Sequence, residues 1–358
     1  MSKTDPGRFF EDFRLGQVIV HATPRTITAG DVALYTALYG PRFSLFSSDV
    51  FARDCGLEPA PVDPLIAFHV VFGKTVPDIS LNAVANLGYA EGRFLGPVHP
   101  GDTLSARSEV IGLKENANGK TGVVYVRTTG VNQRGVAVLS YVRWVMVRKR
   151  DPGAVVEGGT VPELATAVAA ADLVAPPGLD FKRYDFAHAG APHAFEDYAV
   201  GEKIDHVDGM VVEEAEAQMA TRLWQNTAKV HFNQFERAQI ERGGDPSGRR
   251  LVYGGVVIST AKALSFNGLQ NAGLILAING GRHVSPYFAG GTVFAWSEVL
   301  DKAELSPTVG ALRLRLVATV DRPCADFPDK KTLGDDTGAY APGVILDFDH
   351  WAAVPKRG

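Results

Sequence analysis

The sequence repeats itself once, and no other feature limits the possible folds of the chain as strongly. Phe10-Glu11-Asp12 is followed at fixed distances by a glycine, an isoleucine and a histidine, and the same pattern begins again at Phe195. A second block, 92–110, is identical to 281–299 at nine of nineteen positions, in the same order along the chain. Average composition would give about one identity. We therefore expect two duplicated domains.

Between the copies lies a stretch, 151–180, that is rich in Ala, Gly and Pro. Such a composition is typical of a linker. We predict a first domain over 1–150, a linker over 151–190 and a second domain over 191–358. The repeated blocks lie 185 and 189 positions from their copies, so the second domain needs a four-residue insertion. The polar, Gly- and Pro-rich residues 241–250 are the expected place for it.

Each copy has the same predicted order of elements. A short strand leads into an amphipathic helix, whose apolar residues recur three and four positions apart. A second helix is apolar on nearly every side and must be enclosed by the rest of the domain. Alternating stretches then indicate antiparallel strands. The predicted helices are 31–39, 65–76, 213–224 and 256–269, and the clearest strands are 103–113, 121–132 and 136–147. A long buried helix inside an antiparallel sheet is the hotdog arrangement, so two copies predict a double hotdog of the α+β class.

Composition and charge argue against several classes of function. With 36 Lys and Arg against 40 Asp and Glu, the formal net charge is −4, and no basic block marks a surface for nucleic acid or an anionic membrane. No stretch reaches the roughly 18 apolar residues of a spanning helix, and the first ten residues do not resemble a secretory signal. The two cysteines are too few for a disulfide framework or a Cys-rich metal site. We expect a cytoplasmic protein.

The two copies differ most where the amphipathic helix ends. The second copy has Asn226 and His231 there, whereas the first copy has Pro41 and Phe46 at the matching positions. Residues five apart on a helix point about 140° away from each other. The side chains of Asn226 and His231 can therefore converge only if the chain leaves the helix between them.

Asn226-x-x-x-x-His231, followed by Leu251-Val252-Tyr253-Gly254-Gly255 at the start of an apolar helix, resembles the motif of the MaoC-like dehydratases and R-specific enoyl-CoA hydratases. Their motif runs Asp-x-Asn-Pro-x-His, with a Val-His-Gly element further on. The resemblance covers residues 9–150 and 194–355. Within this superfamily the double length and the stretches 225–233 and 63–69 are most similar to the mesaconyl-CoA hydratases, also called β-methylmalyl-CoA dehydratases.

The resemblance implies hydration of an α,β-unsaturated CoA thioester without a metal or redox cofactor. It makes His231 the general acid and base, and the backbone N–H of Gly254 the donor to the thioester oxygen. Tyr253 stands where the family has a histidine and, like Gly255, is a candidate for substrate contact. Arg282 is a candidate for binding a CoA phosphate or the free carboxylate of the substrate, because its planar guanidinium suits both.

One departure concerns the aspartate of the family, which is Asn226 here. An amide cannot exchange a proton near neutral pH. Either Asn226 only orients the water while His231 moves both protons, or a carboxylate from elsewhere replaces the aspartate. The candidates for that carboxylate are Glu236, Asp245, Asp49 and Asp63.

The first copy lacks the residues that this chemistry needs. Phe46 stands for the histidine, Pro41 for its polar partner and Leu65 for the glycine. We therefore expect one active site per chain, with the first copy supporting the fold and forming part of the CoA cleft. His69 and His99 of that copy are candidates to border the cleft.

The preferred function is a hydro-lyase that interconverts mesaconyl-CoA and β-methylmalyl-CoA, which in the family serves the ethylmalonyl-CoA pathway or the 3-hydroxypropionate cycle. Three alternatives stay open: an R-specific enoyl-CoA hydratase for monocarboxylic acyl chains, a hotdog acyl-CoA thioesterase, and a catalytically inactive protein that binds CoA esters. Monomer and homo-oligomer are both compatible with the sequence.

Overall fold

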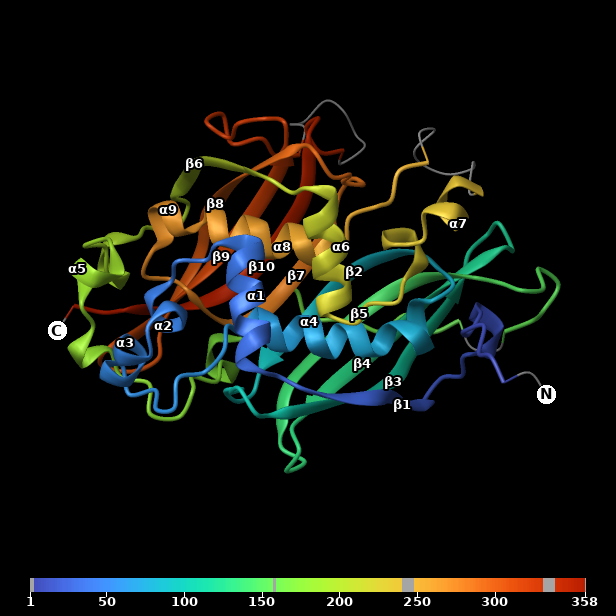
Figure 1. Ribbon diagram of the computed structural model, residues 1–358, viewed down its shortest axis with the longest axis horizontal. Helices are drawn as coiled ribbons and strands as arrows, with labels where there is room; N and C mark the ends of the chain where they lie inside the picture. The colour runs from blue at the N-terminus through green and yellow to red at the C-terminus, as the bar shows by residue number, and fades with distance from the viewer. Residues whose placement is uncertain (1–2, 157–158, 240–247, 331–338, 358) are drawn as a thin grey trace.

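The computed structural model describes residues 3–156, 159–239, 248–330 and 339–357. Their strands form one antiparallel sheet in the order β1-β3-β4-β5-β2-β7-β10-β9-β8-β6 (Figure 1). The first half contains η1 (Phe10–Asp12), β1 (Val18–Thr26), α1 (Ala29–Tyr39), α2 (Ser44–Ser47), α3 (Asp49–Asp54), α4 (Pro64–Thr75), η2 (Val76–Ser80), β2 (Ala83–Phe94), β3 (Thr103–Glu115), β4 (Thr121–Val131) and β5 (Ala137–Arg148). The second contains η5 (Phe195–Asp197), β6 (Lys203–Val211), α6 (Glu214–Leu223), η6 (Lys229–His231), α7 (Gln234–Gln239), α8 (Gly254–Leu264), α9 (Phe266–Leu269), β7 (Leu274–His283), β8 (Thr292–Glu304), β9 (Val309–Val320) and β10 (Val344–Pro355).

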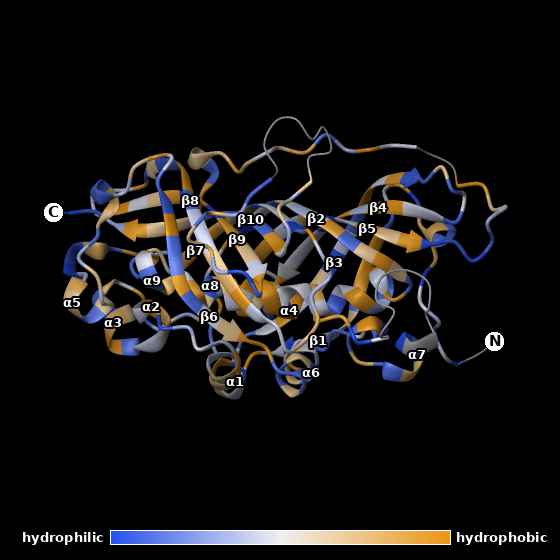
Figure 2. Cartoon of the chain, turned by 90° about the horizontal axis from the view of Figure 1, so that it is seen from above, coloured by the Kyte–Doolittle hydropathy of each residue, from blue (hydrophilic) through white to orange (hydrophobic). Residues whose placement is uncertain are grey.

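The two apolar helices lie in the interior. Every residue of α4 except Pro64 is buried, and so is every residue of α8 except Gly254. The sheet covers one side of both helices, and α1 and α6 lie side by side on the other (Figure 2). A helix that is apolar all round needs such enclosure, since any exposed side would present apolar surface to water. The predicted double hotdog is confirmed.

The two halves join edge to edge through β2 and β7. Tyr89 lies opposite Gly281 in this pairing, and Ala90 lies opposite Gly280. A Cβ at Gly281 would come within 2.7 Å of the Tyr89 ring, so glycine is needed for the ring to lie across the junction. The halves therefore share one continuous sheet and one apolar core that includes both central helices.

The repeated Phe-Glu-Asp motif anchors each half in the same way. Asp12 accepts a hydrogen bond from the N–H of Phe9, and Asp197 accepts one from the N–H of Ala194. The ring of Phe10 lies where a Cβ of Gly122 would be, and the ring of Phe195 takes the corresponding place over Gly310. The rings anchor the start of each half on its sheet.

The repeated histidine also has the same partner in both halves. His21 Nε2 lies 2.8 Å from the hydroxyl of Ser108, and His206 Nε2 lies 2.8 Å from that of Ser297. Each serine belongs to the second repeated block. The two blocks that the sequence shares therefore meet within each half, and the shared polar residues contribute to the fold.

The central helix of the second half is shorter than predicted. The expected helix over 256–269 ends at Leu264, because Asn267 and Gly268 leave the helical conformation, Gly268 with φ of +100°. The predicted insertion over 241–250 falls mostly on residues 240–247, which lie outside the described residues.

The connecting segment contains η3 (Ala170–Asp172), η4 (Phe181–Arg183) and α5 (Phe186–Ala189). It packs along both halves, since Thr160 bridges to Leu113, and the carbonyl of Val168 accepts a hydrogen bond of 3.0 Å from the Trp351 indole. Among the described residues, no helix is both long and apolar enough to span a membrane.

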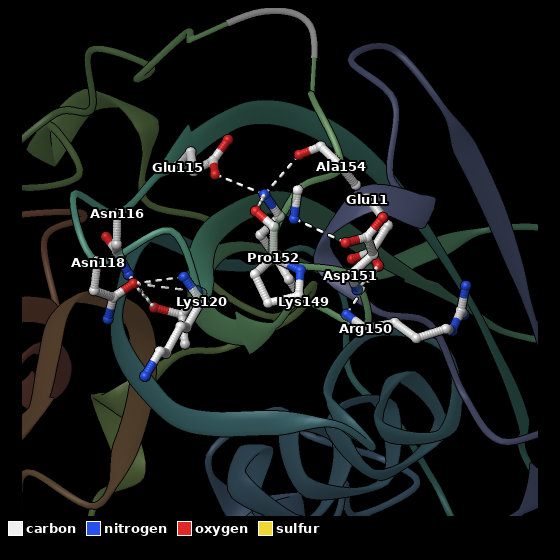
Figure 3. A network of polar contacts seen from close by, with 12 residues as sticks. Glu11, Glu115, Asn116, Asn118, Lys120, Lys149, Arg150, Asp151, Pro152 and Ala154 are labelled. Atoms are coloured by element: carbon white, nitrogen blue, oxygen red, sulfur yellow. Dashed lines mark hydrogen bonds and ion pairs between the residues drawn. The ribbon is translucent and has the colours of Figure 1, made fainter.

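Where β5 ends, a lysine holds several segments together (Figure 3). The side chain of Lys149 is 1% exposed, and its ammonium group donates to Glu115 at 2.7 Å and to the carbonyls of Pro152 and Ala154 at 3.0 and 2.6 Å. The next two N–H groups of the chain donate to the carboxylate of Glu11. The exit from the first half is thereby fixed to its N-terminal segment and to β3.

Candidate active site

The helix α6 ends at Leu223, so the chain leaves it before Asn226 and not, as the sequence suggested, between Asn226 and His231. Gln225 has φ of +51°, in the left-handed region, and the matching residue of the first half, Gly40, has φ of +59°. Both helices therefore stop at a left-handed residue, which glycine adopts at no steric cost and glutamine does not.

Residues of the first half hold this strained turn in place. Arg25 donates to the carbonyl of Leu223, and the ammonium group of Lys74 donates to the side-chain oxygen of Gln225. A Cβ at Gly73 of α4 would overlap the carbonyl of Trp224, so glycine allows the turn to lie against α4. The position of Asn226 thus depends on the first half as much as on its own.

Asn226 is 4% exposed and presents a hydrogen-bond donor. Its side-chain oxygen accepts from the N–H of Ala228 at 2.9 Å, which fixes the orientation of the amide. The amide nitrogen is buried and has no partner among the described residues. A buried donor without an acceptor is costly, so this nitrogen is suited to an oxygen of water or substrate.

His231 follows at the end of η6 with one ring nitrogen committed. The Leu251 carbonyl accepts a hydrogen bond of 2.9 Å from Nδ1, so Nδ1 carries the proton of the neutral ring and Nε2 keeps its lone pair. Burial lowers the pKa of His231 to about 4. The ring is therefore neutral at physiological pH, and Nε2 can accept a proton.

The start of α8 offers two unused N–H groups, those of Gly254 and Gly255, which have no acceptor among the described residues. The first two N–H groups of any helix have no partner within it, and the helix dipole favours an anion there.

The start of α4 in the first half has neither group to offer. Counting from the caps Asp63 and Tyr253, Gly254 corresponds to Pro64 and Gly255 to Leu65, a shift of one residue from the pairing that the sequence repeat suggests. Pro64 has no N–H, and the N–H of Leu65 donates to the carboxylate of Asp63 at 2.9 Å.

Tyr253 is packed between His231 and the first half. Its ring centre is 5.7 Å from that of His231 and 5.8 Å from that of His69. His69 is fully buried. Its Nδ1 is 3.4 Å from the hydroxyl oxygen of Tyr253, and its Nε2 is 2.8 Å from the hydroxyl oxygen of Ser259. Burial lowers the pKa of His69 to about 3, so it is a neutral member of this cluster.

A third histidine, His283, belongs to the same cluster and was not among the residues predicted from the sequence. Its ring occupies the place that a Cβ of Gly254 would take, and its Nε2 is 3.5 Å from the Tyr89 hydroxyl. Burial and the neighbouring His231 lower its pKa to about 4. The repeat contains a signal for it, since Phe94 is the matching residue of the first copy, just as Phe46 matches His231.

Arg282 and the candidate carboxylates lie elsewhere. Arg282 precedes His283 on β7, so its side chain points to the opposite, exposed face of the sheet, with the Tyr340 ring 6.0 Å away. Glu236 forms an ion pair of 3.2 Å with Lys229. Asp49 and Asp63 line a small cavity of the first half together with Pro41 and Phe46, and Asp245 lies outside the described residues. Within the described ranges, no three His, Cys, Asp or Glu side chains are grouped to hold a metal ion.

A family model described as mesaconyl-CoA hydratase matches residues 2–324. The chain belongs to the mesaconyl-CoA hydratase family. The family resemblance read from Asn226, His231 and the glycines of α8 is thereby confirmed, as is the assignment to the hydratases.

Relatives of the mesaconyl-CoA hydratase family match the whole chain. A protein of Cereibacter sphaeroides named mesaconyl-CoA hydratase is 64% identical over 355 residues, covering 99% of this chain and 100% of the relative. A protein of Chloroflexus aurantiacus named β-methylmalyl-CoA dehydratase is 60% identical over 359 residues, covering 100% and 99%.

Solved structures agree with the fold of this mesaconyl-CoA hydratase family member. A MaoC domain protein dehydratase from Chloroflexus aurantiacus is 59% identical, covers 100% of both chains and has a TM-score of 0.95. A conserved protein of Mycobacterium tuberculosis, described as a double hotdog, is 25% identical with a TM-score of 0.74 and covers 98% of this chain and 99% of its own.

Proposed function

We propose that this chain is a hydro-lyase that reversibly adds water to mesaconyl-CoA and forms β-methylmalyl-CoA. The observation that carries the reaction type is the neutral imidazole of His231, whose Nε2 is free to accept a proton in the same cluster as the unused N–H groups of α8. The names of the two full-length relatives support the substrate pair.

In the hydration direction, Nε2 of His231 removes a proton from water while the water oxygen bonds to Cβ. The double-bond electrons move toward the thioester, whose oxygen becomes negative. The N–H groups of Gly254 and Gly255 stabilise that charge. The protonated His231 then gives its proton to Cα, so that one water has been added and the imidazole is neutral again.

Asn226 orients the attacking water. Its free amide nitrogen donates a hydrogen bond to the water oxygen and leaves a water proton directed at His231. This is the first of the two roles that the sequence allows. Glu236 is occupied by Lys229, and Asp49 and Asp63 lie with the first-half counterparts of the site, so no described candidate carboxylate contacts His231.

Arg282 contributes to binding of the CoA portion. Its exposure suits a flexible, solvated phosphate better than a carboxylate held at the reacting atoms. Tyr253 borders the acyl group, with His69 behind it.

The test follows the absorbance of the enoyl-thioester band after purified protein is added to mesaconyl-CoA or, in a parallel assay, to crotonyl-CoA. A thiol reagent in the same assays detects any free CoA that is released. We expect loss of the band with mesaconyl-CoA, a much slower loss with crotonyl-CoA, and no release of thiol. Faster turnover of crotonyl-CoA would identify a monocarboxylic enoyl-CoA hydratase. Release of thiol would identify a thioesterase, and binding without change in either signal would contradict an enzymatic role.

A further inference from the structure

An arginine without a carboxylate partner is buried in the first half beside the candidate active site. Arg143 of β5 is 0% exposed. One terminal nitrogen donates to the Thr75 hydroxyl at 2.7 Å, and the Ser80 hydroxyl lies 3.4 Å from the same nitrogen. The Nε of Arg143 is buried and has no partner, and no ion pair involves this residue among the described residues.

The contrast with other arginines of the sheet is clear. Arg313 forms an ion pair of 2.6 Å with Asp349, and Arg315 forms one of 2.9 Å with Asp347. A guanidinium is charged at every physiological pH, so burial cannot neutralise it. Hydroxyls and the end of α4 compensate the charge only in part, and the group retains a strong preference for an anion.

Arg143 is close to the residues that surround His231. It lies directly opposite Tyr89 on β2, and Tyr89 lies opposite Gly281, two residues before His283 on the same face. Two strand spacings separate the backbones of β5 and β7, about 10 Å, which an arginine side chain and a small acyl group can bridge together.

The Phe72 ring provides a second connection, from the inner side of α4, which lies over the strands of the first half (Figure 1). The guanidinium carbon of Arg143 is 4.4 Å from the centre of this ring, and the ring centre of Tyr253 is 5.5 Å from it on the second-half side. Along both routes one aromatic side chain separates Arg143 from the cluster around His231.

We propose that Arg143 binds the free carboxylate of the acyl group and makes the enzyme selective for dicarboxylic substrates. This inference rests on the proposed function, because mesaconyl-CoA carries that carboxylate on Cβ, the carbon that water attacks. Nε has no partner, and the terminal nitrogen beside it donates one N–H to Thr75 while its second N–H has only the long 3.4 Å contact with Ser80. Nε and this second N–H form the planar pair of donors that matches a carboxylate. Thr75 holds the guanidinium in place, since its own hydroxyl proton is donated to the carbonyl of Phe72.

A monocarboxylic substrate has no group to pair with Arg143. When crotonyl-CoA binds, its methyl group faces the guanidinium and displaces water without replacing the hydrogen bonds. A site built around a charged donor rejects such an analogue strongly. The selectivity therefore depends on a residue of the first half, although His231 belongs to the second.

The experiment measures kcat/KM for mesaconyl-CoA and crotonyl-CoA with the wild type, Arg143→Gln and Arg143→Lys. For Arg143→Gln we expect a loss of about 100-fold with mesaconyl-CoA and no loss with crotonyl-CoA. Arg143→Lys keeps the charge and recovers part of the preference. Arg127→Gln is the control, because Arg127 lies on the neighbouring strand β4 and forms an ion pair with Glu91 at 2.6 Å. Its selectivity should equal that of the wild type.

Equal losses with both substrates in Arg143→Gln would show a structural role and overturn the inference. If neither Arg143 variant folds, Thr75→Val decides, because it removes the hydroxyl that positions the guanidinium and preserves the shape of the side chain. We expect it to weaken mesaconyl-CoA hydration alone, and an unchanged selectivity would contradict the proposal. A wild type that does not hydrate mesaconyl-CoA would instead contradict the proposed function itself.

Discussion

At His231 the two ring nitrogens have separate tasks. Nδ1 carries the proton and donates a hydrogen bond to the Leu251 carbonyl, and burial lowers the pKa of the ring to about 4. Hydration needs the neutral ring, so kcat/KM should stay constant from pH 8 to pH 5.5 and decrease only as the pH approaches 4. Short assays started by dilution from pH 7 would measure this profile. A midpoint near the ordinary histidine pKa of about 6.5 would contradict the lowering of the pKa by desolvation.

Asn226 provides a second prediction at the same scale. Asn226→Ala removes the donor that orients water and should lower kcat by about 100-fold with a smaller change in KM. Asn226→Asp keeps the acceptor for the Ala228 N–H but presents an acceptor in place of the donor, so it should also lose activity. Near wild-type turnover in Asn226→Ala would exclude the orienting role, and faster turnover in Asn226→Asp would favour a proton-transferring carboxylate at this position.

The two copies show how far single residues can be interpreted from sequence alone. His231 was predictable because Phe46 stands opposite it, and the same comparison of His283 with Phe94 would have drawn attention to His283. Arg143 offered no such sign, because the unpaired state of an arginine depends on which strands lie beside it. Only the pairing of Arg143 with Tyr89, and of Tyr89 with Gly281, brings it near the second half.

Among the elements, the end of β5 provides a prediction about stability. Lys149→Met leaves the carbonyls of Pro152 and Ala154 and the carboxylate of Glu115 without their donor (Figure 3). The free energy of unfolding should decrease by about 2 kcal/mol. Urea unfolding measures this change. Lys120→Met is the matched control, because the side chain of Lys120 is exposed on the adjoining turn. Equal effects of the two substitutions would show that the buried contacts of Lys149 add nothing.

The elements themselves were predictable to different degrees. The enclosed helices follow from apolar residues on nearly every side, and α4 was expected within one residue of its bounds. The end of the second helix was placed too far along the chain, because Gly268 marks a stop in the sequence but the backbone already leaves the helical conformation at Asn267. The pairing of β2 with β7 could not be derived from periodicity, since alternation shows which face of a strand is buried but not which strand lies beside it.

For the molecule as a whole, acid should be strongly destabilising. Burial lowers the pKa of five histidines in the folded state: His69, His206, His231, His283 and His350. Their unfolded-state pKa is about 6.5, so the stability they contribute is fully present above that pH and is lost as the pH falls toward the lower folded values. Asp63, whose pKa is raised by burial, offsets one of these protons.

The free energy of unfolding should therefore fall by on the order of 5 kcal/mol between pH 6.5 and pH 5. Calorimetry in buffers of different ionisation enthalpy would count the protons taken up on unfolding, and we expect close to four at pH 5. His350→Leu should reduce the uptake by one, because neither ring nitrogen of His350 has a hydrogen-bond partner among the described residues. His188→Gln, at an exposed residue, should preserve the acid dependence. An uptake near zero would contradict neutral buried histidines.

The cap of α4 has a consequence for the evolution of the duplicated chain. In the first half Asp63 fills the anion position at the head of its own helix, and Pro64 has removed the N–H beside it. Restoring a histidine at Phe46 would not recreate a reaction centre, because the acyl oxygen would still meet a carboxylate. A reaction centre in the first half would therefore need changes at Phe46, Asp63 and Pro64 together. A single substitution cannot restore a site in the first half after the duplication. Its proposed role is instead to select the substrate for the site in the second half.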